Sequence, residues 1–514
     1  MPRPDRPDRP DRRAVPPSPH PTLRTADPPL PWTAGVEREV LPNGLTVLAQ
    51  RDDSAPVAAV VTHIRAGFFD EPDEWAGLSH VLEHMFFKGT PTRGVGAVAR
   101  ETKGLGGYLN AGTGYDRTSY YVVVPARNLA RAIDIQADAL QRATLDPGEL
   151  ARELQVIIEE AKRKRDTPSA VASETLHELL FDRHRIRRWR IGHEEALARF
   201  SGAELRAYYT SRYVPARTIV SIVAAVPVAE MLAAARSAYG GWPDRAADVP
   251  AGPTEPPRTG VRIRTLRGDV AQADLVLGWR GVPPLDPDEA ALDLAATVLA
   301  TGRGSRLHAR LRETGVATSV GAWHYSQGDV GVFAVHVDGD PARVPEMLEG
   351  IANEVQRLRR DGPGAAELDR ARTLLRVRWA RQFESYEGQA SALAGAEALG
   401  GVRLVDEEYT RMVAVSSDDV RRAALRYLDP DAVSAVAYLP RDRGEDLDAG
   451  RLRAAFDPSP SPIAAALDAE IPVPNARPVT GRSVAGVEHV RLPGADLLLR
   501  RRPGTPLVTL GAYF

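Results

Sequence analysis

The amino-terminal half of the chain alternates between the hydrophobic period of strands and that of helices. Residues 36–51 predict two short strands joined by an Asn43-Gly44 turn, and residues 57–65 predict a third strand rich in Val and Ala. Further strands are expected at 118–124 and 219–226, and helices at 129–143, 148–165 and 228–238. This mixture predicts an α+β layer, in which helices pack on one face of a sheet.

The same order of patterns returns in the second half of the chain. Strand patterns at 261–265 and 273–279 precede a helical pattern at 288–301. A strand pattern at 331–337 and a helical pattern at 368–381 follow. The fold class predicted is therefore α+β, with two tandem, pseudo-repeated domains. Each is expected to be a mostly antiparallel sheet with helices packed on one face.

Composition sets the expected domain boundaries. Pro, Arg and Asp dominate the first residues, which cannot bury enough apolar surface to fold. Pro-, Gly- and Ala-rich stretches separate the later segments. We expect a disordered tail (1–33), a first domain (35–247), a linker (248–258), a second domain (259–440), a linker or hinge (441–486) and a carboxyl-terminal segment (487–514).

The carboxyl-terminal segment repeats the opening of the chain. Leu492-Pro493-Gly494-Ala495 echoes Leu41-Pro42-Asn43-Gly44, and the resemblance extends over residues 487–510. We therefore interpret residues 487–514 as the truncated start of a second half that is homologous to the first.

Charge and cysteine content narrow the classes of function. The 514 residues carry a formal net charge of −2 and contain no cysteine. The near-neutral charge gives no reason to expect nucleic acid or an anionic membrane as partner, and disulfide and thiolate chemistry are excluded. No signal peptide and no apolar run long enough to span a bilayer is recognisable, so a cytoplasmic location is the default expectation.

Candidate chemistry lies in the amphipathic helix predicted over residues 78–87. His80 and His84 are four residues apart and share one face, which is the arrangement of two imidazoles that bind zinc. Glu83 lies at the edge of that face and could act as a general base without being a ligand. The alternative is two ordinary histidines on a polar helix face.

A third ligand is expected from the helix at 148–165. Glu153 and Glu160 are seven residues apart and share a face, whereas Glu159 points about 100° away from Glu160. Glu160 is the better candidate ligand, and Glu153 is a candidate for orienting a ligand through a hydrogen bond. Three solvated carboxylates remain the alternative.

His80-x-x-Glu83-His84, followed by Glu160, resembles the inverted zinc motif of the pitrilysin (insulinase) family of metallopeptidases. The resemblance covers residues 36–440 and implies one zinc ion held by His80, His84 and Glu160. It further implies that Glu83 is the general base and that Glu153 supports the site.

Residues 106–113 resemble a second segment of that family. The resemblance implies that an edge strand here pairs with the substrate backbone, with Asn110 and Ala111 beside the scissile bond. The alternative is a glycine-rich turn.

The second domain keeps the pattern without the chemistry. Residues 288–301 contain no histidine, and residues 371–381 contain no carboxylate. The resemblance also implies that an Arg and a Tyr from a second half reach toward the substrate. Thr318 stands where that Tyr is expected, so this copy does not supply the pair.

These patterns predict a zinc endopeptidase acting on peptides or unfolded chains in a chamber closed by a second homologous half. That half would lie in the same chain beyond Phe514 or in a partner chain. The rival arrangement is a homodimer in which Arg306 or Arg312 of this chain alone reaches toward the substrate. A non-catalytic scaffold or peptide-binding subunit is the alternative function.

Overall fold

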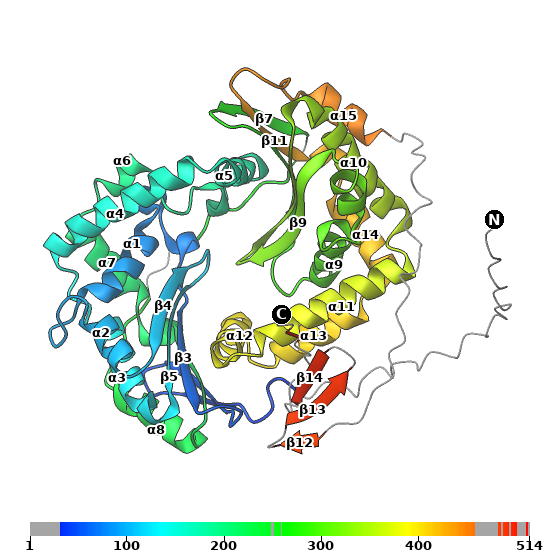
Figure 1. Cartoon of the computed structure of the whole chain (residues 1–514). Helices are drawn as coiled ribbons and strands as arrows, with labels where there is room; N and C mark the ends of the chain where they lie inside the picture. The colour runs from blue at the N-terminus through cyan, green and yellow to red at the C-terminus, as the bar shows by residue number, and fades with distance from the viewer. Residues whose placement is uncertain are drawn as a thin grey trace, which may run out of the picture.

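A computed structural model describes residues 31–247, 251–258, 260–457, 482–484, 487–492, 495–500 and 510–511. The chain forms two α+β domains that face each other across the molecule (Figure 1). The predicted fold class is confirmed, since both domains have a mostly antiparallel sheet with packed helices. No helix among the described residues is long and apolar enough to cross a membrane.

The first domain has a six-stranded sheet in the order β1-β2-β6-β3-β5-β4. Only the β2–β6 pair is parallel. Gly44 has a φ of +87° in the β1–β2 turn, a conformation that glycine adopts without steric cost. The strands are β1 (Glu37–Val40), β2 (Thr46–Arg51), β3 (Val57–Ile64), β4 (Tyr108–Thr113), β5 (Thr118–Pro125) and β6 (Thr218–Ala224).

Helices α1, α3 and α8 cover one face of this sheet. Their buried side chains, such as Val81, Ile133 and Met231, pack with Val60 and Val122 of the sheet. The helices are α1 (Leu78–Met85), α2 (Ala97–Gly104), α3 (Leu129–Gln141), α4 (Pro147–Arg165), α5 (Pro168–Leu180), α6 (Glu194–Leu197), α7 (Gly202–Arg212) and α8 (Val228–Tyr239).

The second domain repeats this topology. Its sheet order, β7-β11-β8-β10-β9, corresponds to β2-β6-β3-β5-β4 of the first sheet. Its strands are β7 (Arg262–Gly268), β8 (Ala273–Gly281), β9 (Ala317–Gln327), β10 (Val330–Gly339) and β11 (Ser434–Pro440). Its helices are α9 (Glu289–Ala300), α10 (Val344–Asp361), α11 (Ala365–Gln382), α12 (Tyr386–Leu399), α13 (Leu404–Ala414), α14 (Ser417–Tyr427) and α15 (Ala449–Phe456).

One helix of each domain packs on the sheet of the other domain, an arrangement called here the exchange of α5 and α12. Helix α12 of the second domain packs on β3 and β6, where Leu393 lies in one apolar cluster with Val61 and Val223. Helix α5 of the first domain packs on β8 and β11, where Leu176 contacts the face at Gly278. Figure 1 shows α12 beside the first sheet and α5 reaching toward the second. The face of each sheet that its own helices leave open is thus filled by the other domain.

The ordered domains reach further than composition predicted. Trp32, inside the expected tail, packs against Phe383 with ring centroids 4.7 Å apart. Helix α15, inside the expected hinge, buries Leu452 and Phe456 in the core of the second domain. The remainder of the expected tail, residues 1–30, and residues 458–481 of the expected hinge lie outside the described residues.

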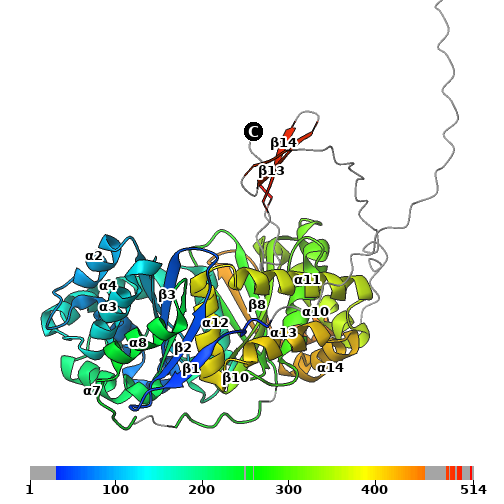
Figure 2. The same cartoon turned by 90° about the horizontal axis from the view of Figure 1, so that it is seen from below.

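A small antiparallel sheet forms in the carboxyl-terminal segment. Its strands are β12 (Arg482–Val484), β13 (Val487–Leu492) and β14 (Ala495–Arg500), and Figure 2 shows it outside the two domains. The β13–β14 pair has the same antiparallel arrangement as β1–β2, whose sequence it echoes. That it begins a second half stays a prediction.

Candidate metal centre

Helix α1 is fixed at its amino terminus by a carboxylate from outside the helix. Gly77, which precedes the helix, has a φ of +100° and offers no capping side chain. Glu71, itself buried, accepts hydrogen bonds from the backbone N–H groups of Gly77 (2.9 Å) and Ser79 (2.6 Å). Two orphan donors of the helix end are thereby satisfied, which holds the helix and its two histidines in place.

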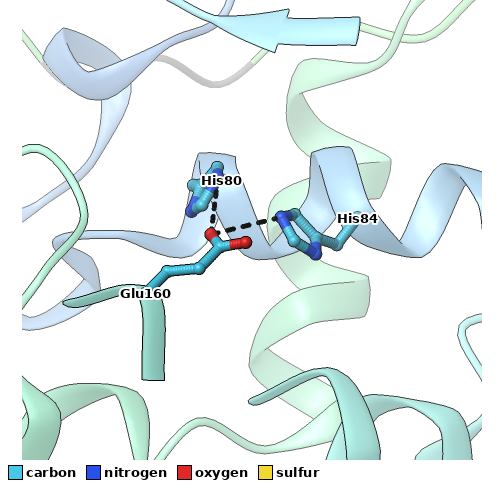
Figure 3. Close-up of side chains that lie close together, drawn as sticks. All are labelled: His80, His84 and Glu160. Carbon is cyan, nitrogen blue, oxygen red and sulfur yellow. Dashed lines mark ion pairs between the residues drawn. The ribbon is translucent and has the colours of Figure 1, made fainter. Parts of the chain in front are cut away.

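Glu160 of α4 lies between the two histidines of α1. Its Oε2 atom is 3.9 Å from His80 Nε2 and 3.8 Å from His84 Nε2 (Figure 3). The ligand atoms of the three residues all lie within 4.8 Å of one another. Burial, followed by the neighbouring His84, lowers the pKa of His80 to about 4. Its imidazole is therefore neutral at pH 7, the form that donates a lone pair to a metal.

Glu153 of α4 holds the second histidine from behind. Its Oε2 atom is 3.0 Å from His84 Nδ1, and its Oε1 atom pairs with the ammonium of Lys88. Burial opposes ionisation of Glu153, but hydrogen bonds from Lys88 and His84 keep its pKa below the ordinary value. A charged carboxylate at Nδ1 favours the tautomer in which Nε2 is free to face Glu160.

Glu83 lies beside the group of three without being part of it. The hydroxyl of Thr113, at the end of β4, donates a 2.5 Å hydrogen bond to Glu83 Oε2. Burial raises the pKa of Glu83, and the Thr113 and His84 contacts only partly offset this. A carboxyl with a raised pKa is suited to exchanging protons near neutral pH.

The alternative carboxylate, Glu159, points elsewhere. It is exposed and forms a 2.8 Å ion pair with Lys162 on the same helix. The helical-wheel preference for Glu160 over Glu159 thus agrees with the geometry.

Strand β4 passes next to α1 and forms one edge of the sheet. Among the described strands, β4 pairs only with β5, so its outer edge is open. Asn110 is exposed on this strand, and its Oδ1 accepts a hydrogen bond from the N–H of Ala111 (2.9 Å). The structure thus places both residues on the expected edge strand, and their role stays a prediction.

The sequence analysis missed two residues of this centre. Glu71 fixes the start of α1, and Lys88 is a cation that pairs with Glu153. Lys88 follows His84 by four residues, a spacing that could have indicated a common partner for the two side chains. Glu71 precedes the helix by a turn of irregular backbone and has no periodic signal.

A histidine pair on one helix, a carboxylate from a second helix and a supported imidazole form the donor set of a candidate metallohydrolase centre. Comparison with known families agrees. Residues 46–192 match the model of insulinase (peptidase family M16), and residues 199–375 match that of the peptidase M16 inactive domain. The chain belongs to peptidase family M16, with both its catalytic-type and its inactive domain present.

Two relatives of the chain are named as a zinc protease and as a subunit of a processing peptidase. It is 28% identical over 403 residues to the uncharacterized zinc protease YmxG of Bacillus subtilis, covering 78% of this chain and 98% of that protein. It is 29% identical over 437 residues to a probable mitochondrial-processing peptidase subunit beta of Arabidopsis thaliana, covering 82% of this chain and 81% of that protein.

Solved structures share the fold at lower identity. A protease from Helicobacter pylori superimposes with a TM-score of 0.74 at 22% identity, covering 79% of this chain and 99% of that one. The periplasmic protease PqqL from Escherichia coli gives a TM-score of 0.69 at 19% identity, covering 93% of this chain but 57% of that one. The fold of PqqL therefore extends well beyond the matched part.

Proposed function

We propose that this chain is the catalytic part of a zinc-dependent endopeptidase. The observation that carries the proposal is the convergence of His80 Nε2, His84 Nε2 and one oxygen of Glu160, with His84 supported by Glu153. Two imidazoles and one carboxylate are a catalytic zinc donor set. A zinc ion held there would supply a Lewis acid for the scissile carbonyl.

Glu83 is the general base in this proposal. It would take a proton from the attacking water and pass it to the leaving amine. Burial raises the pKa of its carboxyl, which makes Glu83 a stronger proton acceptor than an ordinary glutamate. Thr113 orients the carboxylate through one oxygen and leaves the other for the water.

The open edge of β4 is the proposed substrate site. A peptide that adds as a further strand would form main-chain hydrogen bonds there, with Asn110 and Ala111 beside the bond to be cleaved. Such binding accepts extended chains, which favours peptides and unfolded segments as substrates.

A second homologous half is the proposed partner. Thr318, at the position of the expected Tyr, uses its hydroxyl to donate to the carbonyl of Asp338 (3.1 Å). Arg306 is buried and paired with Glu367, so it does not reach outward, whereas Arg312 is exposed. The longer PqqL chain and a relative named as a subunit support a two-part assembly. Full peptidase activity of the 514-residue chain as a monomer would contradict this part of the proposal.

The test is the variant Glu83→Gln in the full-length enzyme, with the proposed second half present. We expect bound zinc to be retained and peptide hydrolysis to fall about a hundredfold or more, because the proton acceptor is lost. Glu159→Gln, an exposed carboxylate of α4, is the matched control and should leave both unchanged. Full activity of Glu83→Gln would refute its role. A protein purified without chelators that holds no zinc would favour the scaffold function instead.

A further inference from the structure

A second group of metal-ligand side chains lies on the sheet of the second domain. Asp274 of β8 stands directly opposite Asp338 of β10, and His336 is two residues before Asp338 on the same face. Ser319 of β9 stands opposite Asp338 on its other side. Backbone pairing of three neighbouring strands therefore fixes the positions of all four residues.

The carboxylates of Asp274 and Asp338 both lie close to the Nε2 atom of His336. His336 Nε2 is 3.1 Å from Asp274 Oδ2 and 3.2 Å from Asp338 Oδ1. A protonated Nε2 has one N–H, which points well at only one acceptor, and neither contact reaches hydrogen-bond geometry. The ligand atoms of the three residues lie within 4.8 Å of one another, an arrangement of donors around a common point.

A proton on His336 does not fully balance the negative charge of Asp274 and Asp338. Asp274 is 5% exposed, and its Oδ1 atom is buried without a hydrogen-bond partner among the described residues. Like charges directly opposite on neighbouring strands are destabilising. Two carboxylates and one imidazolium leave a net negative charge, whereas a divalent cation and a neutral imidazole leave none. Burial makes that difference costly.

We propose that Asp274, His336 and Asp338 form a second metal site, which binds a divalent first-row transition-metal ion such as zinc or manganese. One imidazole and two carboxylates suit these ions, whereas calcium and magnesium prefer oxygen ligands alone. Ser319 donates to Asp338 Oδ2 and so turns Oδ1 toward the site. His336 keeps 18% of its side chain exposed, which leaves a path for the ion.

The site is independent of the His80–His84–Glu160 centre, which lies in the other domain. Its role is structural: the ion would join β8 to β10 on the face that α5 covers further along. In Figure 1 the neighbouring strand β9 faces the space between the two domains.

The test uses the full chain carrying His80→Ala and Glu160→Gln, so that the first centre is disabled. Titration with Co²⁺, a visible probe for such sites, should give one equivalent per chain with a d–d absorption band. Asp338→Asn and His336→Gln, added separately, should each weaken binding about tenfold or more. Asp269→Asn removes an exposed carboxylate of the β7–β8 turn and should change nothing.

Two results would overturn the proposal. One is the absence of Co²⁺ binding in the disabled background, which would leave the three residues as an ion triad. The other is a band that persists in both Asp338→Asn and His336→Gln. Should either variant not fold, thermal unfolding of the background protein decides: a rise in Tm with Co²⁺ that a chelator reverses supports the site, and no rise refutes it.

Discussion

The two domains arrange the same elements around the same position, and only the first makes a metal-ligand group there. In the second domain, α9, β9 and α11 are the counterparts of α1, β4 and α4. They line a cavity of about 270 Å³. Asp293 of α9 pairs with His324 of β9 at 2.9 Å, and α11 contributes Arg378 to the cavity, whereas α4 contributes Glu160 to the metal centre.

The side chains that the two domains place at this position differ. The cavity of the second domain mixes the carboxylates of Glu289, Asp293 and Glu408 with the cations of Arg378 and Arg411. Neither of the two metal-ligand groups found among the described residues lies in it. A repeated fold thus carries chemistry only where helix spacing and charge supply it.

The largest expected effect is the loss of the metal centre. His80→Ala removes one of three ligands, so bound zinc, measured by elemental analysis, and peptidase activity should both fall below detection. Asp293→Asn, in the corresponding cavity of the second domain, should leave both intact. An equal loss in the two variants would show that the domains are not functionally distinct.

Next in size is the effect of the exchanged helices on stability. Leu176→Ala in α5 and Leu393→Ala in α12 each empty a buried site at a domain interface and should cost about 2–5 kcal/mol of unfolding free energy. Denaturant unfolding with the exposed Leu425→Ala as control measures this. A large loss for one helix only would break the symmetry of the exchange.

The support behind His84 predicts a smaller effect. Glu153→Gln keeps the shape but loses the charge that faces His84 Nδ1 and Lys88, so zinc affinity should fall about 10–100-fold. Competition with a chromogenic chelator measures the affinity. Unchanged binding would mean that Glu153 serves the fold and not the ligand.

The buried His63 predicts a gradual loss of stability as the pH falls. Burial lowers the pKa of His63 on β3 to about 3, whereas the unfolded chain protonates near 6.5. The contribution of the neutral His63 ring to the unfolding free energy is fully present above pH 6.5. It falls as the pH drops toward 3, by up to about 1.4 kcal/mol per pH unit.

The second domain differs in this respect. Although burial lowers the pKa of His336, the close carboxylates of Asp274 and Asp338 raise it to about 10, so in the metal-free chain this ring is protonated throughout that window. The difference in unfolding free energy between pH 7 and pH 5, measured with denaturant, should therefore be smaller in His63→Leu. The exposed control His193→Leu should keep the full difference. An unchanged difference in His63→Leu would assign the acid sensitivity to other groups.

The sequence indicated which candidate side chains of α1 and α4 share a helix face, because those signals are local. Four-residue spacing places His80 and His84 on one face of α1, and seven-residue spacing does the same for Glu153 and Glu160 on α4. Strand periodicity likewise predicted β3, β5 and β10 to within a few residues. Boundaries were weaker, because the packing of Trp32 and of α15 depends on distant partners.

The sequence by itself therefore determined the repeated α+β pattern and which candidate ligands share a helix face, since both follow from periodicity within single helices and strands. Tertiary structure alone decided the exchange of α5 and α12 and the anchoring of α1 by Glu71. It also decided the meeting of Asp274 with His336 and Asp338. These contacts join segments distant in sequence or separated by irregular backbone. Their geometry is set by sheet register and by burial of complementary faces, which leave no local trace in the sequence.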